Sequence, residues 1–178
     1  MNTLYNVQNY KEGKGNMKRN SLLVIPIVLL MFLAGCVSSE KQDALLKYLN
    51  EDLVEIAEIE TAMLESYGSV SGNNYTDDAD MYDELTMNTI ELAKQLNIKA
   101  VDVMNSLTDE NIMEVHKLYV EFTTKYISAF TLMLAALEEQ DHKLIAEANE
   151  YIAEGNNLGF DYQRGLQKLA DEYDVTFE

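Results

Sequence analysis

The sequence is poor in basic residues, in proline and in cysteine, and it contains no tryptophan. Its 178 residues include 31 aspartates and glutamates against 13 lysines and arginines, for a formal net charge of -18. Affinity for a phosphate backbone comes from lysine and arginine, so this balance excludes a nucleic-acid-binding protein. The single cysteine excludes an internal disulfide and a zinc site built from several thiolates.

The usual catalytic signatures are missing as well. The sequence has no Gly-x-Ser-x-Gly nucleophile elbow and no phosphate-binding glycine loop, and its two histidines, His116 and His142, offer few choices for a general base. Hydrophobic residues make up 47% of the chain, which is too many for a disordered acidic tail. The length suits one compact domain. We therefore expect a folded protein that is not an enzyme.

The longest apolar run lies near the amino terminus. It extends from Leu22 to Leu33 (LLVIPIVLLMFL), and Lys18 and Arg19 precede it. A membrane-spanning helix needs about 20 apolar residues, so this run is too short to span a bilayer. The same argument excludes an uncleaved membrane anchor. A short apolar core behind a basic segment is the pattern of a signal peptide.

The end of this run carries a more specific motif, Leu33-Ala34-Gly35-Cys36. It resembles the lipobox of a bacterial lipoprotein precursor, as in small helical lipoproteins of the Gram-positive type. The resemblance implies transfer of diacylglycerol to the thiol of Cys36 and cleavage between Gly35 and Cys36. It also implies attachment to the extracytoplasmic face of the cell membrane. The alternative is an ordinary secretory signal in which Cys36 simply lies near the cleavage site.

These features divide the chain into three parts. Residues 1–35 form the expected signal peptide, residues 36–42 the lipid anchor and tether, and residues 43–178 the folded domain. Translation is expected to start at Met17 rather than Met1, because residues 1–16 precede the basic segment; a long basic region is the alternative. Loss of residues 1–35 removes four bases and one acid, which leaves 30 acidic and 9 basic residues with a net charge of -21.

Apolar residues of the domain recur with a helical period. The clearest segment is predicted to form a helix over residues 109–138. Its apolar positions advance by steps of three and four, as in helices that pack into bundles: Ile112, Val115, Tyr119, Phe122, Tyr126, Ala129, Met133 and Ala136. Thr108 is the expected N-cap of this helix, and Asp141 is the expected N-cap of the last helix, which continues to about residue 174.

Two earlier segments show the same periodicity. The first extends from Leu45 to Gly68, and the second from about Asp77 to Leu107, with Asn97 as an expected weak point. The domain lacks proline and has few glycines, which argues against a turn-rich β protein. Short connections between long helices favour antiparallel neighbours. We predict an all-α fold and, within that class, an antiparallel up-down-up-down four-helix bundle.

One face of the last predicted helix carries the candidate binding residues. Tyr151, Tyr162 and Tyr173 follow one another at intervals of 11 residues and therefore share a face, with Gly155 and Gly159 between them. Amphipathic tyrosine rings suit a groove for a partner or ligand. The simpler alternative is that the tyrosines fill the interior and that the glycines permit a close helix approach or a kink.

A cluster of acidic residues follows residue 76. Asp77, Asp78 and Asp80 are candidate ligands for a divalent cation, but the segment lacks the glycine and the distal glutamate of an EF-hand loop. The simpler interpretation is that acids accumulate at a helix amino terminus because they interact favourably with its dipole. Di-iron bundles use a Glu-x-x-His pair on each of two helices, whereas this chain offers one such pair, Glu139 to His142, and it straddles a predicted turn. We therefore expect no metal and no other cofactor, and we expect His116 to be partly buried or at the surface.

The function class follows from these features together. A lipobox, bundle-forming helices and no catalytic set favour a lipid-anchored, extracytoplasmic module that contacts another protein or an envelope polymer. Its charge favours a cationic partner. The alternative is a lipoprotein that binds a small ligand or a divalent cation. The sequence does not specify the molecule that is bound.

Overall fold

Every regular element in residues 39–177, the part of the chain that this computed structural model describes, is a helix. The all-α prediction is therefore confirmed. The expected signal peptide and lipobox, including Gly35 and Cys36, lie outside the described residues. In chain order the elements are α1 (Glu40–Lys47), η1 (Tyr48–Asp52), α2 (Val54–Ser69), η2 (Gly72–Asn74), α3 (Asp78–Glu84), η3 (Leu85–Thr89), α4 (Ile90–Ser106), α5 (Glu110–Glu139) and α6 (His142–Glu172).

The two longest helices begin and end close to their predicted bounds. α5 extends from Glu110 to Glu139, but its N-cap is Asp109 rather than Thr108. The Asp109 carboxylate accepts hydrogen bonds from the backbone N–H groups of Asn111 (2.9 Å) and Ile112 (3.0 Å). A carboxylate at this position also interacts with the helix dipole, which a threonine hydroxyl does not. Asp141 caps α6 as predicted.

Two π-helical segments interrupt what would otherwise be long regular helices. At η1 the N–H of Leu53 donates to the carbonyl of Tyr48 (3.1 Å), and at η3 the N–H of Ile90 donates to the carbonyl of Leu85. Both bonds span five residues instead of four, which defines a π-helical turn. The predicted weak point was wrong, because Asn97 lies inside the regular helix α4. Its amide donates to the hydroxyl of Thr123 at 2.8 Å.

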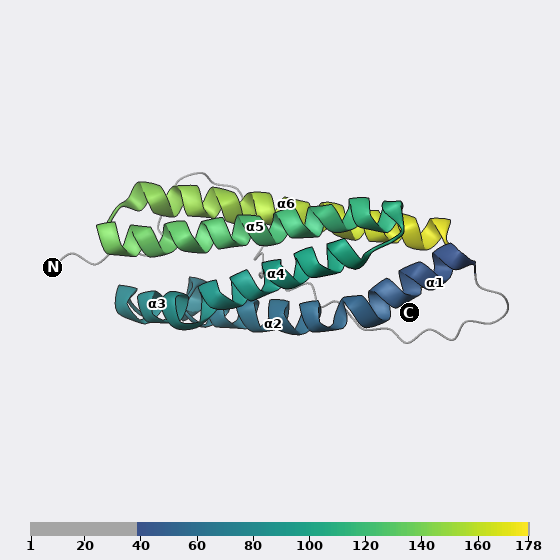
Figure 1. The fold of residues 1–178 in the computed structure, drawn as a ribbon. Coiled ribbons are helices and arrows are strands. Elements are labelled where there is room, and N and C mark those ends of the chain that lie inside the picture. Colours follow the sequence, from purple (N-terminus) through teal and green to yellow (C-terminus); the bar gives the residue numbers. More distant parts are fainter. Residues whose placement is uncertain (1–38, 178) are drawn as a thin grey trace.

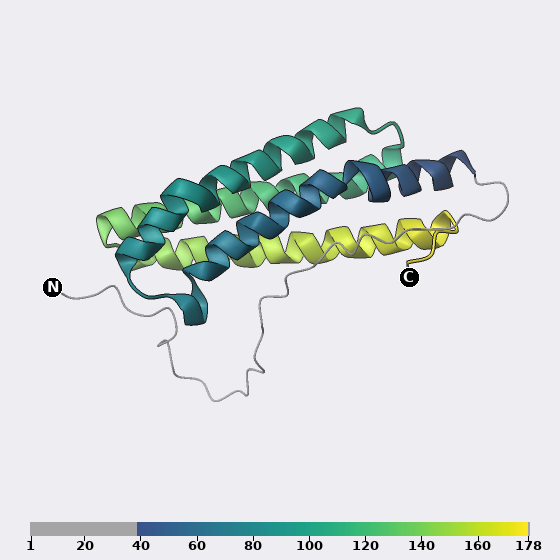
Figure 2. The same ribbon diagram turned by 90° about the horizontal axis from the view of Figure 1, so that it is seen from below.

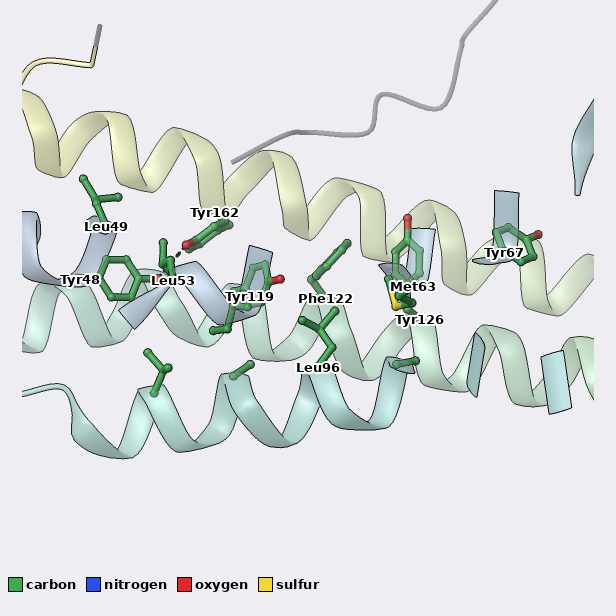
Figure 3. Packing of buried hydrophobic residues seen from close by; sticks show 14 of the residues in the cluster. Tyr48, Leu49, Leu53, Met63, Tyr67, Leu96, Tyr119, Phe122, Tyr126 and Tyr162 are labelled. Carbon is green, nitrogen blue, oxygen red and sulfur yellow. Dashed lines mark hydrogen bonds between the residues drawn. The ribbon is translucent and has the colours of Figure 1, made fainter. Parts of the chain in front are cut away.

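The helices form one elongated body with an aromatic interior. α5 and α6 lie side by side over their whole length, α4 packs against α5, and α2 packs against α4 (Figures 1 and 2). A row of aromatic rings from several helices fills the space between them (Figure 3). Successive ring centroids, from Phe122 to Tyr126 and on to Phe130, are 4.8 and 5.6 Å apart.

The first and the last residues of the folded region lie at the same end of this body. α1 begins at Glu40, with Ser39 as its N-cap, three residues before the expected boundary of the domain. The side chain of Gln42 donates to the backbone carbonyl of Asp174 at 3.0 Å. The connection between α4 and α5 lies at this same end (Figure 1).

Candidate functional site

An open cleft separates η1 and the start of α2 from the carboxyl-terminal half of α4. It encloses about 240 Å³ and is lined by Glu51, Asp52, Glu55, Lys99, Asp102, Val103 and Ser106. Four of the seven lining residues are carboxylates and one is a base. Pockets for drug-sized ligands are usually larger, at roughly 300–1,000 Å³. The cleft is therefore smaller than a typical ligand pocket and has room for the charged end of a side chain, such as an ammonium or a guanidinium.

The four carboxylates of the cleft differ in how they are paired. Asp52 forms an ion pair with Lys47 at 2.6 Å, and Glu55 forms one with Lys99. These hydrogen bonds raise the pKa of both lysines above its usual value. Neither Glu51 nor Asp102 forms an ion pair with a base within residues 39–177. Each wall of the cleft thus carries one carboxylate that forms no ion pair within that range, although the charges of Glu51 and Asp102 also help to raise the pKa of Lys47 and Lys99.

A fully buried hydrogen-bonded chain lies beneath this cleft. The Tyr48 hydroxyl is 2.7 Å from Nδ1 of His116 and 2.8 Å from the Tyr162 hydroxyl, and Nε2 of His116 is 2.8 Å from the carbonyl oxygen of Ala100. The link between the two tyrosines is drawn as a dashed line in Figure 3. His116 has no exposed surface. The prediction that it is partly buried or at the surface was therefore wrong.

The proton positions in this chain follow from its geometry. A carbonyl oxygen only accepts, so Nε2 of His116 donates to Ala100. Burial lowers the pKa of His116, so the ring is neutral and its Nδ1 accepts from Tyr48. The Tyr48 oxygen then accepts from Tyr162, whose own pKa is raised by burial. Every hydrogen bond of the chain therefore points the same way: Tyr162 donates to Tyr48, Tyr48 donates to His116, and His116 donates to the backbone of α4.

Sequence reasoning missed the cleft and the chain because their parts are far apart along the sequence. Tyr48 lies 68 residues from His116 and 114 residues from Tyr162. No local spacing connects residues on separate helices. The π-helical turn at η1 supplies residues to both features, since Tyr48 faces the interior while Glu51 and Asp52 line the cleft. π-helical turns occur frequently at functional sites.

The predicted tyrosine face of α6 is mostly interior. Tyr162 and Tyr173 are both buried, whereas Tyr151 is half-buried beneath Lys125, whose Nζ is 4.9 Å from the ring centroid. The Tyr173 hydroxyl is 3.2 Å from both carboxylate oxygens of Asp109, the N-cap of α5. The structure therefore places Tyr151 and Tyr162 on α6 and Tyr173 at its C-cap, and the three rings form no open groove.

The two glycines on that face contact aromatic side chains of α5. A Cβ atom at Gly155 would come within 2.9 Å of the Tyr126 ring, and one at Gly159 would be 3.7 Å from Phe122. Both glycines are buried, and α6 continues through them without a break. Their surroundings thus match the alternative in which they allow close packing of helices.

The acidic residues after residue 76 have local structural roles. The Asp77 carboxylate is the N-cap of α3 and accepts from the N–H of Asp80 at 2.9 Å. Asp78 accepts from the Tyr75 hydroxyl, and Asp80 accepts from the Thr76 hydroxyl, each at 2.5 Å. Across residues 39–177 no three histidine, cysteine or carboxylate side chains gather in a way that could hold a metal ion.

Two further findings bear on the function. None of the helices in the described part of the chain is both long enough and apolar enough to cross a membrane. Comparison with known proteins gives no match to a family model, to a curated protein or to a solved structure.

Proposed function

We propose that this chain is a lipid-anchored, extracytoplasmic interaction module that binds a cationic protein or envelope partner through the cleft between η1 and α4. The observation that carries this proposal is that two carboxylates on opposite walls of the cleft, Glu51 and Asp102, form no ion pair with a base of the described residues. A charged hydrogen bond from a lysine or arginine of the partner suits such carboxylates. The net charge of -18 over the whole sequence supports the same partner class by long-range attraction.

The proposed scaffold is an antiparallel up-down-up-down four-helix bundle. In this arrangement α1, η1 and α2 together make the first rod, α3, η3 and α4 make the second, and α5 and α6 are the third and fourth. Short connections support it, because only Leu107 to Asp109 separate α4 from α5, and only Gln140 and Asp141 separate α5 from α6. Such a scaffold holds the two walls of the cleft on neighbouring rods.

The proposed anchor places the cleft near the bilayer. Cys36 precedes the N-cap Ser39 by three residues, a span of at most about 10 Å. α1 then rises by about 12 Å over its eight residues before η1 begins. The cleft would therefore lie within roughly 25 Å of the membrane surface, and its partner would act at that surface.

The proposed role is binding rather than catalysis. The cleft contains no histidine or cysteine, and the hydroxyl of Ser106 donates to the backbone carbonyl of Val103 at 2.8 Å. A serine engaged in this way has no adjacent base to activate it.

The test is the binding of a ten-lysine peptide, measured by calorimetry at low salt. The double variant Glu51→Gln/Asp102→Asn removes the two unpaired charges of the cleft. The matched control Glu147→Gln/Glu150→Gln removes two charges from exposed positions on α6. Two exposed contacts at about 0.2–1 kcal/mol each predict a roughly two- to thirty-fold loss of affinity in the cleft variant.

The control variant should bind within a factor of two of the wild type. An equal loss of peptide affinity in both variants would contradict a specific site, because it would show that binding depends only on the total charge of the protein. The same titration with spermine and with Ca²⁺ examines the alternative, a small-ligand or divalent-cation-binding lipoprotein. Tighter binding of either probe than of the peptide, again lost in the cleft variant, would favour that alternative.

A further inference from the structure

Glu60 on α2 is a carboxyl group inside the aromatic interior. Only 8% of its surface is exposed. Its Oε2 accepts a hydrogen bond from the hydroxyl of Tyr119 on α5 at 2.6 Å. No lysine, arginine or histidine pairs with it in residues 39–177. Burying a carboxylate without a positive partner costs free energy of folding, so the presence of Glu60 in the interior needs an explanation.

The groups that face Glu60 are phenols. α5 contributes Tyr119 and Tyr126, and α6 contributes Tyr162; burial first, and then the charge of Glu60, raise the pKa of all three. On α4, which packs against α2, the base Lys99 forms an ion pair with Glu55. Burial raises the pKa of Glu60 itself to about 7, and the hydrogen bond from Tyr119 partly opposes this rise.

Tyr119 connects Glu60 with the buried chain beneath the cleft. Its ring is stacked on the His116 ring, with centroids 5.8 Å apart and planes at 24°. It also packs against Tyr162 with a centroid distance of 5.0 Å. A displacement of Tyr119 would therefore move both ends of the Tyr162–Tyr48–His116 chain.

We propose that Glu60 and Tyr119 form a protonation-dependent latch between α2 and α5, which is closed while the Glu60 carboxyl is neutral and loosened when it ionises. A neutral carboxyl costs less to bury in an apolar interior than a carboxylate. An ionised carboxylate requires several donors, but the hydroxyls of Tyr126 and Tyr162 already donate to Asn156 and Tyr48, so water would have to supply the others. Since only 8% of Glu60 is exposed, water reaches it more readily when α2 moves away from α5. The latch does not depend on what the cleft binds.

The direction of the pH effect follows from linkage. The pKa of Glu60 is about 7 in the folded protein and near 4.5 when the residue is exposed. The free energy needed to open the latch therefore falls as the pH rises from 4.5 to 7, and it stays constant above pH 7. His116 acts in the opposite sense, because its pKa is lowered by burial and it favours opening at acid pH.

The test is amide hydrogen exchange of α2 and α5 between pH 5 and pH 8, compared between the wild type and Glu60→Gln. The comparison cancels the contribution of His116, which both proteins share. The ratio of wild-type to variant protection should fall by up to about tenfold per pH unit until pH 7 and then stay constant. Glu58→Gln, an exposed change of the same charge on the same helix, should follow the wild type. A ratio that does not change with pH would overturn the proposal.

A second measurement covers the case in which Glu60→Gln does not fold. The carboxyl carbon of Glu60 is followed by NMR during a pH titration of the wild type and of Tyr119→Phe. A midpoint near 7 that rises further in Tyr119→Phe supports the latch, because that variant loses the hydrogen bond that favours the carboxylate. A midpoint near 4.5, or one that Tyr119→Phe leaves unchanged, would overturn it.

Discussion

The ring of Tyr126 occupies the space in which a side chain at residue 155 would lie. A Cβ atom on Gly155 would be 2.9 Å from both Cδ2 and Cε2 of Tyr126, closer than real Cβ contacts. The Tyr126 hydroxyl also donates to the side-chain carbonyl of Asn156 at 2.9 Å, so the ring is held at both ends. α5 and α6 approach each other this closely because residue 155 has no side chain.

Gly155→Ala should therefore destabilise the fold. The added methyl group forces the ring or the helix to shift, and overpacking of this kind costs about 1–3 kcal/mol. Alanine is intrinsically the better helix former, so a stabilisation would show that the contact is not tight. The measurement is chemical denaturation followed by circular dichroism. Gly68→Ala is the control, since a Cβ atom there meets nothing within 4 Å. It should be neutral or stabilising by about 0.5–1 kcal/mol.

His116 should make the protein less stable as the pH falls. Its pKa is lowered by burial in the folded state, so the unfolded chain takes up the proton more readily below about pH 6.5. The stability contributed by the neutral ring is present above that pH and is lost as the pH falls. His116→Gln should remove up to about 1.4 kcal/mol per pH unit of acid dependence relative to the wild type. Denaturation curves at several pH values between 5 and 7.5 measure it.

The second histidine supplies the control for this experiment. His142 is exposed at the start of α6. His142→Gln should retain the acid dependence of the wild type. If both histidine variants gave the same pH dependence as the wild type, the buried ring would not be the group that titrates.

The proposed anchor depends on a single thiol. Cys36→Ala should leave the protein without lipid and uncut at the Gly35–Cys36 bond, because in the proposed lipobox this thiol accepts the diacylglycerol that the lipoprotein peptidase recognises. Mass spectrometry of the membrane fraction measures both changes, and Ser38→Ala is the control. A diacylated, cleaved Cys36→Ala protein would contradict the assignment of the lipobox.

Local signals in the sequence were sufficient for the helices but not for the interior. Asp141 was recognisable as an N-cap, and the acidic run from Asp77 as the start of a helix, because these signals are adjacent in sequence to the helices they begin. The heptad steps identified α5 because one helix face is a local property. Its N-cap was misplaced by one residue, since Thr108 and Asp109 are both good caps and only the carboxylate also interacts with the helix dipole.

The candidate site depends on contacts between helices, and periodicity does not encode them. In the sequence nothing distinguishes Glu60 from the many other acids, because its partner Tyr119 lies 59 residues away. His116 lies beside the apolar face of α5 and could not be placed inside without knowing that Tyr48 and Ala100 offer it hydrogen bonds. The pairing of Asp52 and Glu55 with lysines, which leaves Glu51 and Asp102 unpaired, likewise depends on the fold.

The π-helical segments have a consequence for the comparison of related chains. Each contains one residue more than the α-helical turn it replaces. Residues before η1 are therefore rotated by about 100° relative to their positions in an uninterrupted helix. A homologous chain with straight helices would align with this one only if a single-residue gap were placed within residues 48–52, and a second within residues 85–89. An ungapped alignment would pair interior positions of one chain with surface positions of the other.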